Sequence, residues 1–157
     1  MSDTLRRAAR REEGFTLIEL LVVVMIIGVL VGIAIPSYLG FRRSAQDRSA
    51  QSEIRTVLLA EKAYILQHGA YTEVAAELLP FDPHAAVDDF DSSVGVEPWL
   101  NQDDATIVCL TRDSGSGAVF SAWESAALGS YFGTTDLSGG GGACPDLPPA
   151  GYRHAGW

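Results

Sequence analysis

EEGFTLIELLVVVMIIGVLVGIAIP, residues 12–36, is the stretch that decides the fold of this chain. Within it, the 21 residues of Phe15–Ile35 contain only two side chains with polar groups, those of Thr16 and Glu19. As an α-helix this segment is about 32 Å long, which is enough to cross the hydrocarbon core of a bilayer. The sequence therefore predicts a membrane-spanning helix. A carboxylate inside such a helix is costly, so Glu19 is a functional candidate whose partner needs to be identified.

A cut after Gly14 creates one such partner. A short basic leader ends at Gly14, the apolar run begins at once with Phe15, and Glu19 is the fifth residue counted from Phe15. The new α-amine of Phe15 would be a cation at the membrane edge. It could pair with Glu19 of the same or of a neighbouring chain.

The segment Gly14–Glu19, GFTLIE, resembles the class III signal of type IV prepilins and of the related pseudopilins. The similarity covers residues 6–65 approximately. It implies that a membrane peptidase cuts between Gly14 and Phe15 and that Phe15 is then N-methylated. It also implies that Glu19 pairs with the N-terminal amine of another subunit as a filament assembles.

The resemblance further implies the fold and the place of the protein. The expected fold class is α+β, a pilin fold with one long N-terminal helix packed against a small antiparallel sheet of about three to four strands. The expected domains are a removed leader (1–14), a transmembrane and polymerisation half of the helix (15–36) and an extracytoplasmic head (37–157). The subunit is expected to cross the cytoplasmic (inner) membrane once before assembly and to lie in an extracellular pilus afterwards.

The partners that the resemblance implies follow from this route. They are further copies of the chain in a helical homopolymer, the prepilin peptidase and methylase, the pilus assembly platform, minor pilins and the membrane. No nucleic acid is expected as a partner.

Gly28 and Pro36 are the fourteenth and twenty-second residues after the expected cut, and type IV pilin helices loosen between these positions on assembly. There is also a physical reason for weakness here. Pro36 lacks a backbone donor and its ring clashes with the preceding turn, while Gly28 and Gly32 have low helix propensity. Alternatively, Gly28 and Gly32 form a small-residue packing face and Pro36 only marks the membrane interface.

An ordinary secretory signal is the rival interpretation of the N-terminal region. Gly32-Ile33-Ala34 could be a small-x-small site with cleavage after Ala34. However, the apolar region of such a signal is usually about 7 to 15 residues long and carries no Glu. The arginines before and after the apolar run indicate a cytoplasmic N-terminus only weakly, so the orientation depends mainly on the resemblance.

The charge balance is strongly acidic after the leader. The whole chain carries −9, and the first 14 residues contribute +1 of this, so the remainder carries −10. Such a surface disfavours nonspecific binding to DNA or to anionic lipid, because both are polyanions.

Two cysteines, Cys109 and Cys144, follow the membrane segment. On an extracytoplasmic side they predict a disulfide that would stabilise the fold by about 3 to 4 kcal/mol in the chain-entropy model. Two free buried thiols are the alternative. Metal binding is not expected, because the two cysteines have no neighbouring His ligands.

Beyond Pro36 the helical pattern continues. Apolar residues at helical spacing predict one helix over 15–67, with Gly69 as its left-handed C-cap. A loop with a short helix around 73–79 follows, in which Tyr71 is expected to be a packed aromatic residue. Residues 81–102 are acidic and are predicted to be irregular. The expected apolar stripe of the long helix consists of Ala50, Ile54, Val57, Leu58 and Ile65. Its expected solvent-exposed face consists of Gln46, Asp47, Arg48, Glu53, Arg55 and Lys62.

The strand candidates are 106–111, 118–123 and 130–134, which predict an antiparallel meander with one face on the long helix and one facing solvent. Alternation places Val108 and Leu110 on one face and Ile107 and Cys109 on the other. The glycine-rich tail would be fastened to this sheet by a Cys109–Cys144 bond.

No pattern for an enzyme, a cofactor or a metal appears. Nucleophile-elbow, phosphate-loop and dinucleotide motifs are absent, and His68, His84 and His154 are scattered. Asp89-x-Asp91 lacks the third ligand and the Gly of an EF-hand loop, so a solvated loop is the favoured interpretation. We expect a structural subunit of a type IV pilus, whose uses include adhesion and motility. The alternatives are a type II secretion pseudopilin, a minor or DNA-uptake pilin, and a membrane-tethered binding module that never polymerises.

Overall fold

The computed structural model describes residues 14–88, 91–135, 137, 144–154 and 156–157. The leader before Gly14, Asp89 of the Asp89-x-Asp91 pair and the glycine run 139–142 lie outside the described residues. The chain divides into two compact units, and the boundary lies between Leu39 and Gly40.

The long helix α1 runs from Leu17 to His68, which confirms the predicted helix to within two residues at each end. It ends as expected: Gly69 has a φ of 82°, and its N–H donates to the carbonyl of Ile65 at 2.8 Å. Glycine adopts this left-handed conformation at little energetic cost, because it has no Cβ. The short helix α2 spans Ala75–Leu78, inside the predicted 73–79.

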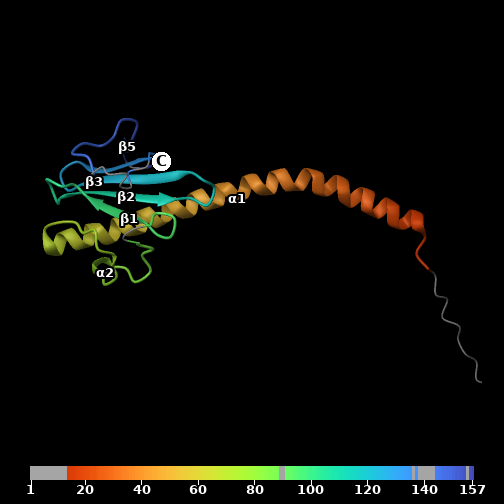
Figure 1. Ribbon diagram of the computed structural model, residues 1–157, viewed down its shortest axis with the longest axis horizontal. Helices are drawn as coiled ribbons and strands as arrows, with labels where there is room; N and C mark the ends of the chain where they lie inside the picture. The colour runs from red at the N-terminus through yellow and green to blue at the C-terminus, as the bar shows by residue number, and fades with distance from the viewer. Residues whose placement is uncertain (1–13, 89–90, 136, 138–143, 155) are drawn as a thin grey trace, which may run out of the picture. The chain divides into compact units, whose positions relative to one another are not determined.

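In the second unit, one stripe of α1 packs against a sheet (Figure 1). Ala50, Ile54, Val57 and Leu58 are buried there, as their helical spacing predicts. They form one core cluster with Val108, Leu110, Ala122 and Phe132 of the sheet, and with Tyr71 and Leu78 of the connection that follows α1. The prediction that Tyr71 is a packed loop aromatic is confirmed, since its side chain is 4% exposed.

The sheet has five antiparallel strands in the order β1-β2-β3-β4-β5. Three of them, β2, β3 and β4, confirm the predicted meander. With β1 and β5 the sheet has five strands, where about three to four were expected. The bounds are Glu97–Leu100 (β1), Ile107–Asp113 (β2), Val119–Ser125 (β3), Gly129–Gly133 (β4) and Arg153–His154 (β5). The prediction that 81–102 is irregular is wrong at β1. That strand contains Pro98, which lowers strand propensity, and it is tolerated because β1 is an edge strand paired only with β2 in the sheet.

Both faces of the sheet are covered. Alternation along β2 is as predicted, with Val108 and Leu110 in the cluster that faces α1, and Ile107 and Cys109 in a second cluster. The prediction that the second face is exposed to solvent is wrong. Its core consists of Ile107, Cys109, Trp123 and Cys144, with Trp99, Tyr131, Leu137 and Tyr152 packed around it.

Candidate functional site

The predicted processing site lies just before α1. Gly14, Phe15 and Thr16 precede the first helical residue, so the Gly14–Phe15 bond is outside regular secondary structure. The Phe15 side chain is 83% exposed. A peptide bond in this conformation needs no helix to be unwound before it can enter a peptidase.

Glu19 closes a capping box at the start of α1. The Thr16 N–H and the Thr16 hydroxyl both donate to Oε2 of Glu19, at 2.9 Å and 2.6 Å. In return, the Glu19 N–H donates to Oγ1 of Thr16 at 3.3 Å. Two backbone donors that the helix leaves unpaired are satisfied in this way. The carboxylate of Glu19 therefore has partners within its own chain.

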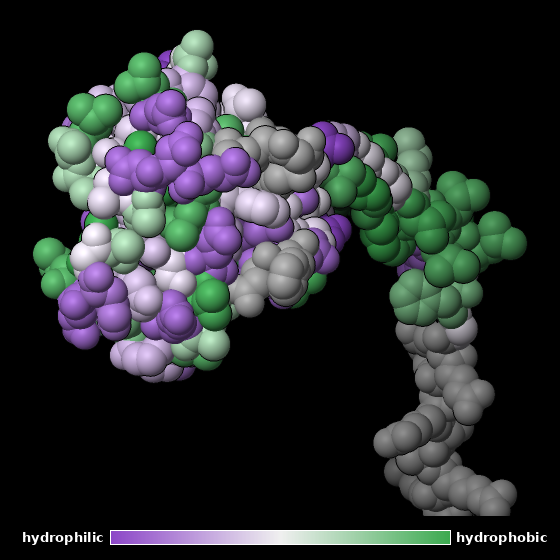
Figure 2. Space-filling model, turned by 60° about the vertical axis from the view of Figure 1, so that its left-hand side comes forward, coloured by the Kyte–Doolittle hydropathy of each residue, from purple (hydrophilic) through white to green (hydrophobic). Residues whose placement is uncertain are grey.

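Past the capping box, the first part of α1 presents apolar side chains on every side. Within the described residues, α1 is the one helix that is long and apolar enough to cross a membrane. In Figure 2 this part appears as a continuous hydrophobic surface in green. A helix that is hydrophobic all round requires an apolar surrounding, either lipid or other helices.

Gly28 and Pro36 both lie inside this part of α1. A Cβ added at Gly28 or at Gly32 would meet nothing within 4 Å, so both glycines leave open space on the helix surface. Pro36 has no N–H to donate to the carbonyl of Gly32. The neighbouring Ser37 hydroxyl donates to the carbonyl of Ile33 at 3.4 Å. The helix continues through this position, but with one backbone hydrogen bond fewer.

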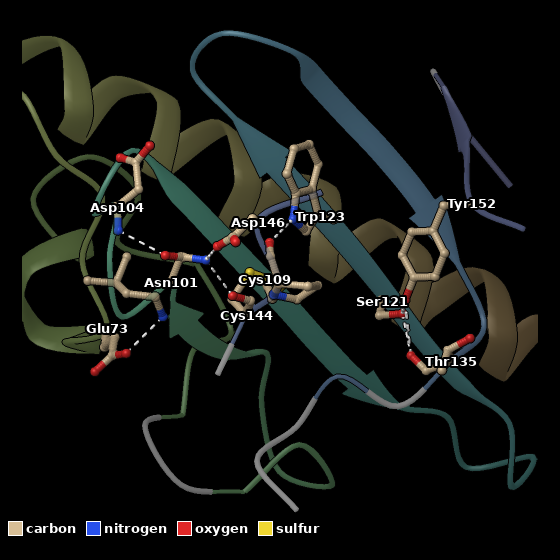
Figure 3. The surroundings of a disulfide bond; sticks show 12 residues. Glu73, Asn101, Asp104, Cys109, Ser121, Trp123, Thr135, Cys144, Asp146 and Tyr152 are labelled. Atoms are coloured by element: carbon tan, nitrogen blue, oxygen red, sulfur yellow. Dashed lines mark hydrogen bonds between the residues drawn. A yellow bond between two sulfur atoms is a disulfide. The ribbon is translucent and has the colours of Figure 1, made fainter. Parts of the chain in front are cut away.

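The second unit contains the predicted disulfide between Cys109 and Cys144, which are 35 residues apart. The bond holds the segment after residue 143 across the second face of the sheet (Figure 3). Trp123 Nε1 donates to the carbonyl of Pro145 at 2.7 Å, and Asn101 Nδ2 donates to the carbonyl of Cys144 at 2.7 Å. Further along, Tyr152 contacts the hydroxyl of Ser121, and its ring occupies the space that a Cβ at Gly133 would need.

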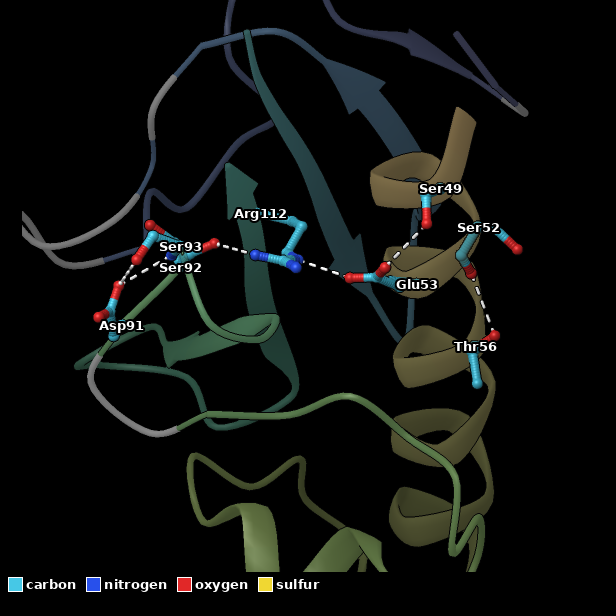
Figure 4. A network of polar contacts seen from close by, with 8 residues as sticks. All are labelled: Ser49, Ser52, Glu53, Thr56, Asp91, Ser92, Ser93 and Arg112. Carbon is cyan, nitrogen blue, oxygen red and sulfur yellow. Dashed lines mark hydrogen bonds and ion pairs between the residues drawn. The ribbon is translucent and has the colours of Figure 1, made fainter. Parts of the chain in front are cut away.

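An arginine on β2 ties the acidic connection to α1 (Figure 4). Nε of Arg112 lies 2.6 Å from Oε2 of Glu53 on α1, and Nη1 donates to the carbonyl of Ser92 at 2.8 Å. The connection is held in turn by Asp91, which accepts from the N–H and the hydroxyl of Ser93. These Ser93 hydrogen bonds lower the pKa of Asp91.

Two carboxylates are buried between α1 and its neighbours. Glu61 is fully buried, and its Oε2 accepts from the N–H of Thr72 at 3.2 Å. Burial raises the pKa of Glu61 to about 8. Glu124 on β3 is 3.3 Å from Nζ of Lys62 and accepts from the Tyr71 hydroxyl at 3.3 Å.

Sequence reasoning missed two features of this arrangement. The Thr16-x-x-Glu19 spacing is the sequence signature of a capping box, and it could have been found. The burial of Glu61 has no such signal, because a Glu beside Lys62 in a helix is usually solvated. Among the described residues, no group of three or more His, Cys, Asp or Glu side chains is placed to hold a metal ion.

Comparison with known proteins adds a family match at the N-terminus. The family described as "Prokaryotic N-terminal methylation motif" matches residues 9–35. This range contains Gly14, Phe15, Glu19 and Gly28.

Several relatives are similar over longer stretches. The type IV major pilin protein PilA of Myxococcus xanthus is 37% identical over 68 residues, which is 43% of this chain and 31% of that protein. The type II secretion system core protein G of Aeromonas hydrophila is 35% identical over 79 residues, 49% of this chain and 55% of that protein. The chain thus spans from just under a third to just over half the length of these two relatives. Core protein G of Pseudomonas aeruginosa is 31% identical over 101 residues, which is 59% of this chain and 71% of that protein.

Proposed function

Because this chain belongs to the family of type IV pilins and the related pseudopilins, we propose that it is the structural subunit of a type IV pilus filament. In this proposal a prepilin peptidase cuts after Gly14 and Phe15 is N-methylated. The subunit is held in the cytoplasmic membrane and then polymerises through the first part of α1 into an extracellular fibre. We propose no catalytic activity for the chain.

The observation that carries the proposal is the environment of Glu19. In the single chain, its carboxylate accepts two hydrogen bonds from Thr16 at the start of an apolar helix, so it is not left without partners while the subunit is stored in lipid. After cleavage, the amine of Phe15 on a neighbouring subunit offers a stronger, charge-assisted partner. Docking with a wrong stagger would bury either charge without a partner, which is costly, so the pair sets the register of the helices.

The stretch between Gly28 and Pro36 serves the same step in this proposal. One backbone hydrogen bond is already missing at Pro36, and the glycines there have low helix propensity. Loosening this stretch when the helices leave the bilayer for the fibre core therefore costs less than it would elsewhere in α1.

A second candidate function is that of a type II secretion pseudopilin. It is favoured by the match to core protein G of Pseudomonas aeruginosa, which covers 71% of that protein. The two functions share cleavage, methylation and polymerisation. They differ in where the fibre is found, since a pseudopilin acts within the secretion machinery and a pilin reaches the cell surface.

Mass spectrometry of the N-terminal peptide from fibres sheared off the cell surface tests the leading proposal. We expect a chain that begins with N-methyl-Phe15. A chain that begins at Ile35, or one that still carries Met1 and is never shed, would mean a secreted or simply anchored domain. A chain that begins at N-methyl-Phe15 but stays in the cell envelope would favour the pseudopilin.

Replacing Glu19 with Ala is expected to leave cleavage after Gly14 intact and to abolish fibres, because the register charge is lost. Electron microscopy and immunoblots of the sheared fraction measure this. The matched control is Thr16→Val, which breaks the capping box but keeps the carboxylate, and it should still give fibres. Normal fibres from the Glu19→Ala variant would rule out the role of Glu19 in assembly.

A further inference from the structure

The second unit carries unlike charges at its two ends. At one end, α1 exposes three arginines, Arg42, Arg43 and Arg48, called here the basic face. This end is marked by the β2–β3 turn, whose Ser114 and Ser116 hydroxyls donate to Oδ1 of Asp47 on α1. In the part of the chain that the structure describes, no hydrogen bond or ion pair engages the three arginine side chains.

Four exposed carboxylates gather at the other end and are called here the acidic end. The Tyr71 N–H donates to the carbonyl of Ala105 at 2.9 Å, which places this end beside the C-terminus of α1. Asn101 organises the group: its Oδ1 accepts from the N–H groups of two of the acidic residues, and its Nδ2 donates to a third at 2.8 Å. The members are Glu73, Asp103, Asp104 and Asp146, three of which are labelled in Figure 3.

The separation of the two surfaces follows from the helix. Asp47 and His68 are 21 residues apart on α1, so the two ends lie about 30 Å from each other along its axis. This distance is about four Debye lengths at physiological salt, so the surfaces do not neutralise one another within one subunit.

Two carboxylates on α1 close to the basic face accept hydrogen bonds within the subunit. Asp47 accepts from Ser114 and Ser116, which lowers its pKa, and Glu53 is paired with Arg112. After Gly14 the chain has only seven cationic side chains against a net charge of −10, so most approaches between two copies are repulsive. An approach that brings the basic face of one copy to the acidic end of another places unlike charges together and is attractive.

We propose that, in the fibre, the acidic end of one subunit docks on the basic face of another copy of this chain. This proposal rests on the pilus function proposed above. The contact joins two different patches, so it can continue from subunit to subunit along a helical filament. It supplies an order for the heads that is separate from the pairing of Glu19 with Phe15 in the helices.

Charge reversal in the full-length chain tests the contact. Arg42→Glu with Arg43→Glu should lower the amount of sheared fibre about tenfold, since two attractive pairs become repulsive at every repeat. Asp103→Lys with Asp104→Lys should do the same. The chain that combines all four changes should recover most of the fibre. Arg153→Glu is the matched control, because it reverses an exposed arginine on β5, and it should leave the amount of fibre unchanged.

The total amount of subunit and its N-terminal processing are measured in every strain. The amount of sheared fibre is then compared between strains that hold equal amounts of processed subunit. Wild-type amounts of fibre from either reversed pair would overturn the inference and leave the pilus function standing. Failure of the combined chain to recover fibre would also overturn the inference. The arginines would then bind a different partner, such as anionic lipid. If the wild-type chain itself forms no fibre, the pilus function falls as well.

Discussion

At the residue scale, the two most informative carboxylates differ in how the chain satisfies them. Glu19 stands at a helix start, where Thr16 lies within reach three residues earlier. That arrangement is local, so it depends only on spacing in the sequence. Glu61 lies in the middle of α1, and its surroundings come from the connection after the helix, through Thr72. Local sequence holds no information about such a neighbour.

The burial of Glu61 predicts a pH-dependent stability. Burial, with a smaller contribution from the charge of Glu77, raises the pKa of Glu61 to about 8 against a lowering by the Thr72 N–H. Below pH 4.5 both the folded and the unfolded chain hold the proton. Between pH 4.5 and about 8 only the folded chain holds it, so the free energy of unfolding falls as pH rises, by at most about 1.4 kcal/mol per pH unit. Above that range both states are ionised and the loss stops growing.

Glu61→Gln should remove this loss, because the amide stays neutral and its oxygen can still accept from Thr72. We expect its stability relative to the wild-type chain to rise from pH 5 to pH 8, measured by urea unfolding of the full chain in detergent micelles. Glu73→Gln, at an exposed position, should keep the wild-type pH dependence. A constant difference between Glu61→Gln and wild type over this range would contradict the prediction.

At the scale of elements, α1 and the strands β2 to β4 follow from periodicity, whereas the edges of the sheet do not. The long helix has an apolar stripe that repeats with the helical period, and β2 alternates between its two faces. The strand β5 consists of Arg153 and His154 only, which is too short for any pattern to be recognised. β1 exists because its residues Glu97–Leu100 find β2 as a partner, in register from Glu97 opposite Thr111 to Leu100 opposite Val108.

Arg112 is expected to fix the acidic connection to α1, because it bonds to both Glu53 and the carbonyl of Ser92. Arg112→Ala should lower the free energy of unfolding by about 1 to 3 kcal/mol, since it leaves partly buried acceptors unpaired. Arg153→Ala, at an exposed position, should change it by no more than about 0.5 kcal/mol. Urea unfolding of both variants measures the difference. Equal effects would mean that the Arg112 contacts do not stabilise the fold.

At the scale of the whole molecule, the two units bury their apolar side chains in different ways. In the unit from Gly40 onward, both core clusters consist of residues of that unit alone. The part of α1 before it has its apolar side chains exposed along its length. The second unit therefore has the requirements of an independent domain, and the first depends on lipid or on other copies.

A chain that begins at Gly40 is accordingly expected to be soluble without detergent and to unfold cooperatively, because its core is complete. Circular dichroism melts and sedimentation check this, and aggregation of the purified fragment would contradict it. In the same fragment, Cys109→Ser with Cys144→Ser should lower the free energy of unfolding by about 3 to 4 kcal/mol, from the loop of 35 residues that the disulfide closes.

The sequence by itself determined the α+β class, the long helix, the central meander and the family. Each of these depends on a local period or on a contiguous motif, and such signals survive without any knowledge of distant contacts. Only the tertiary structure decided that the second face of the sheet is covered, that Glu61 is buried and that Asn101 hydrogen-bonds to Asp146. These features join residues far apart in the chain, and their free energy appears only once the fold has brought the partners together.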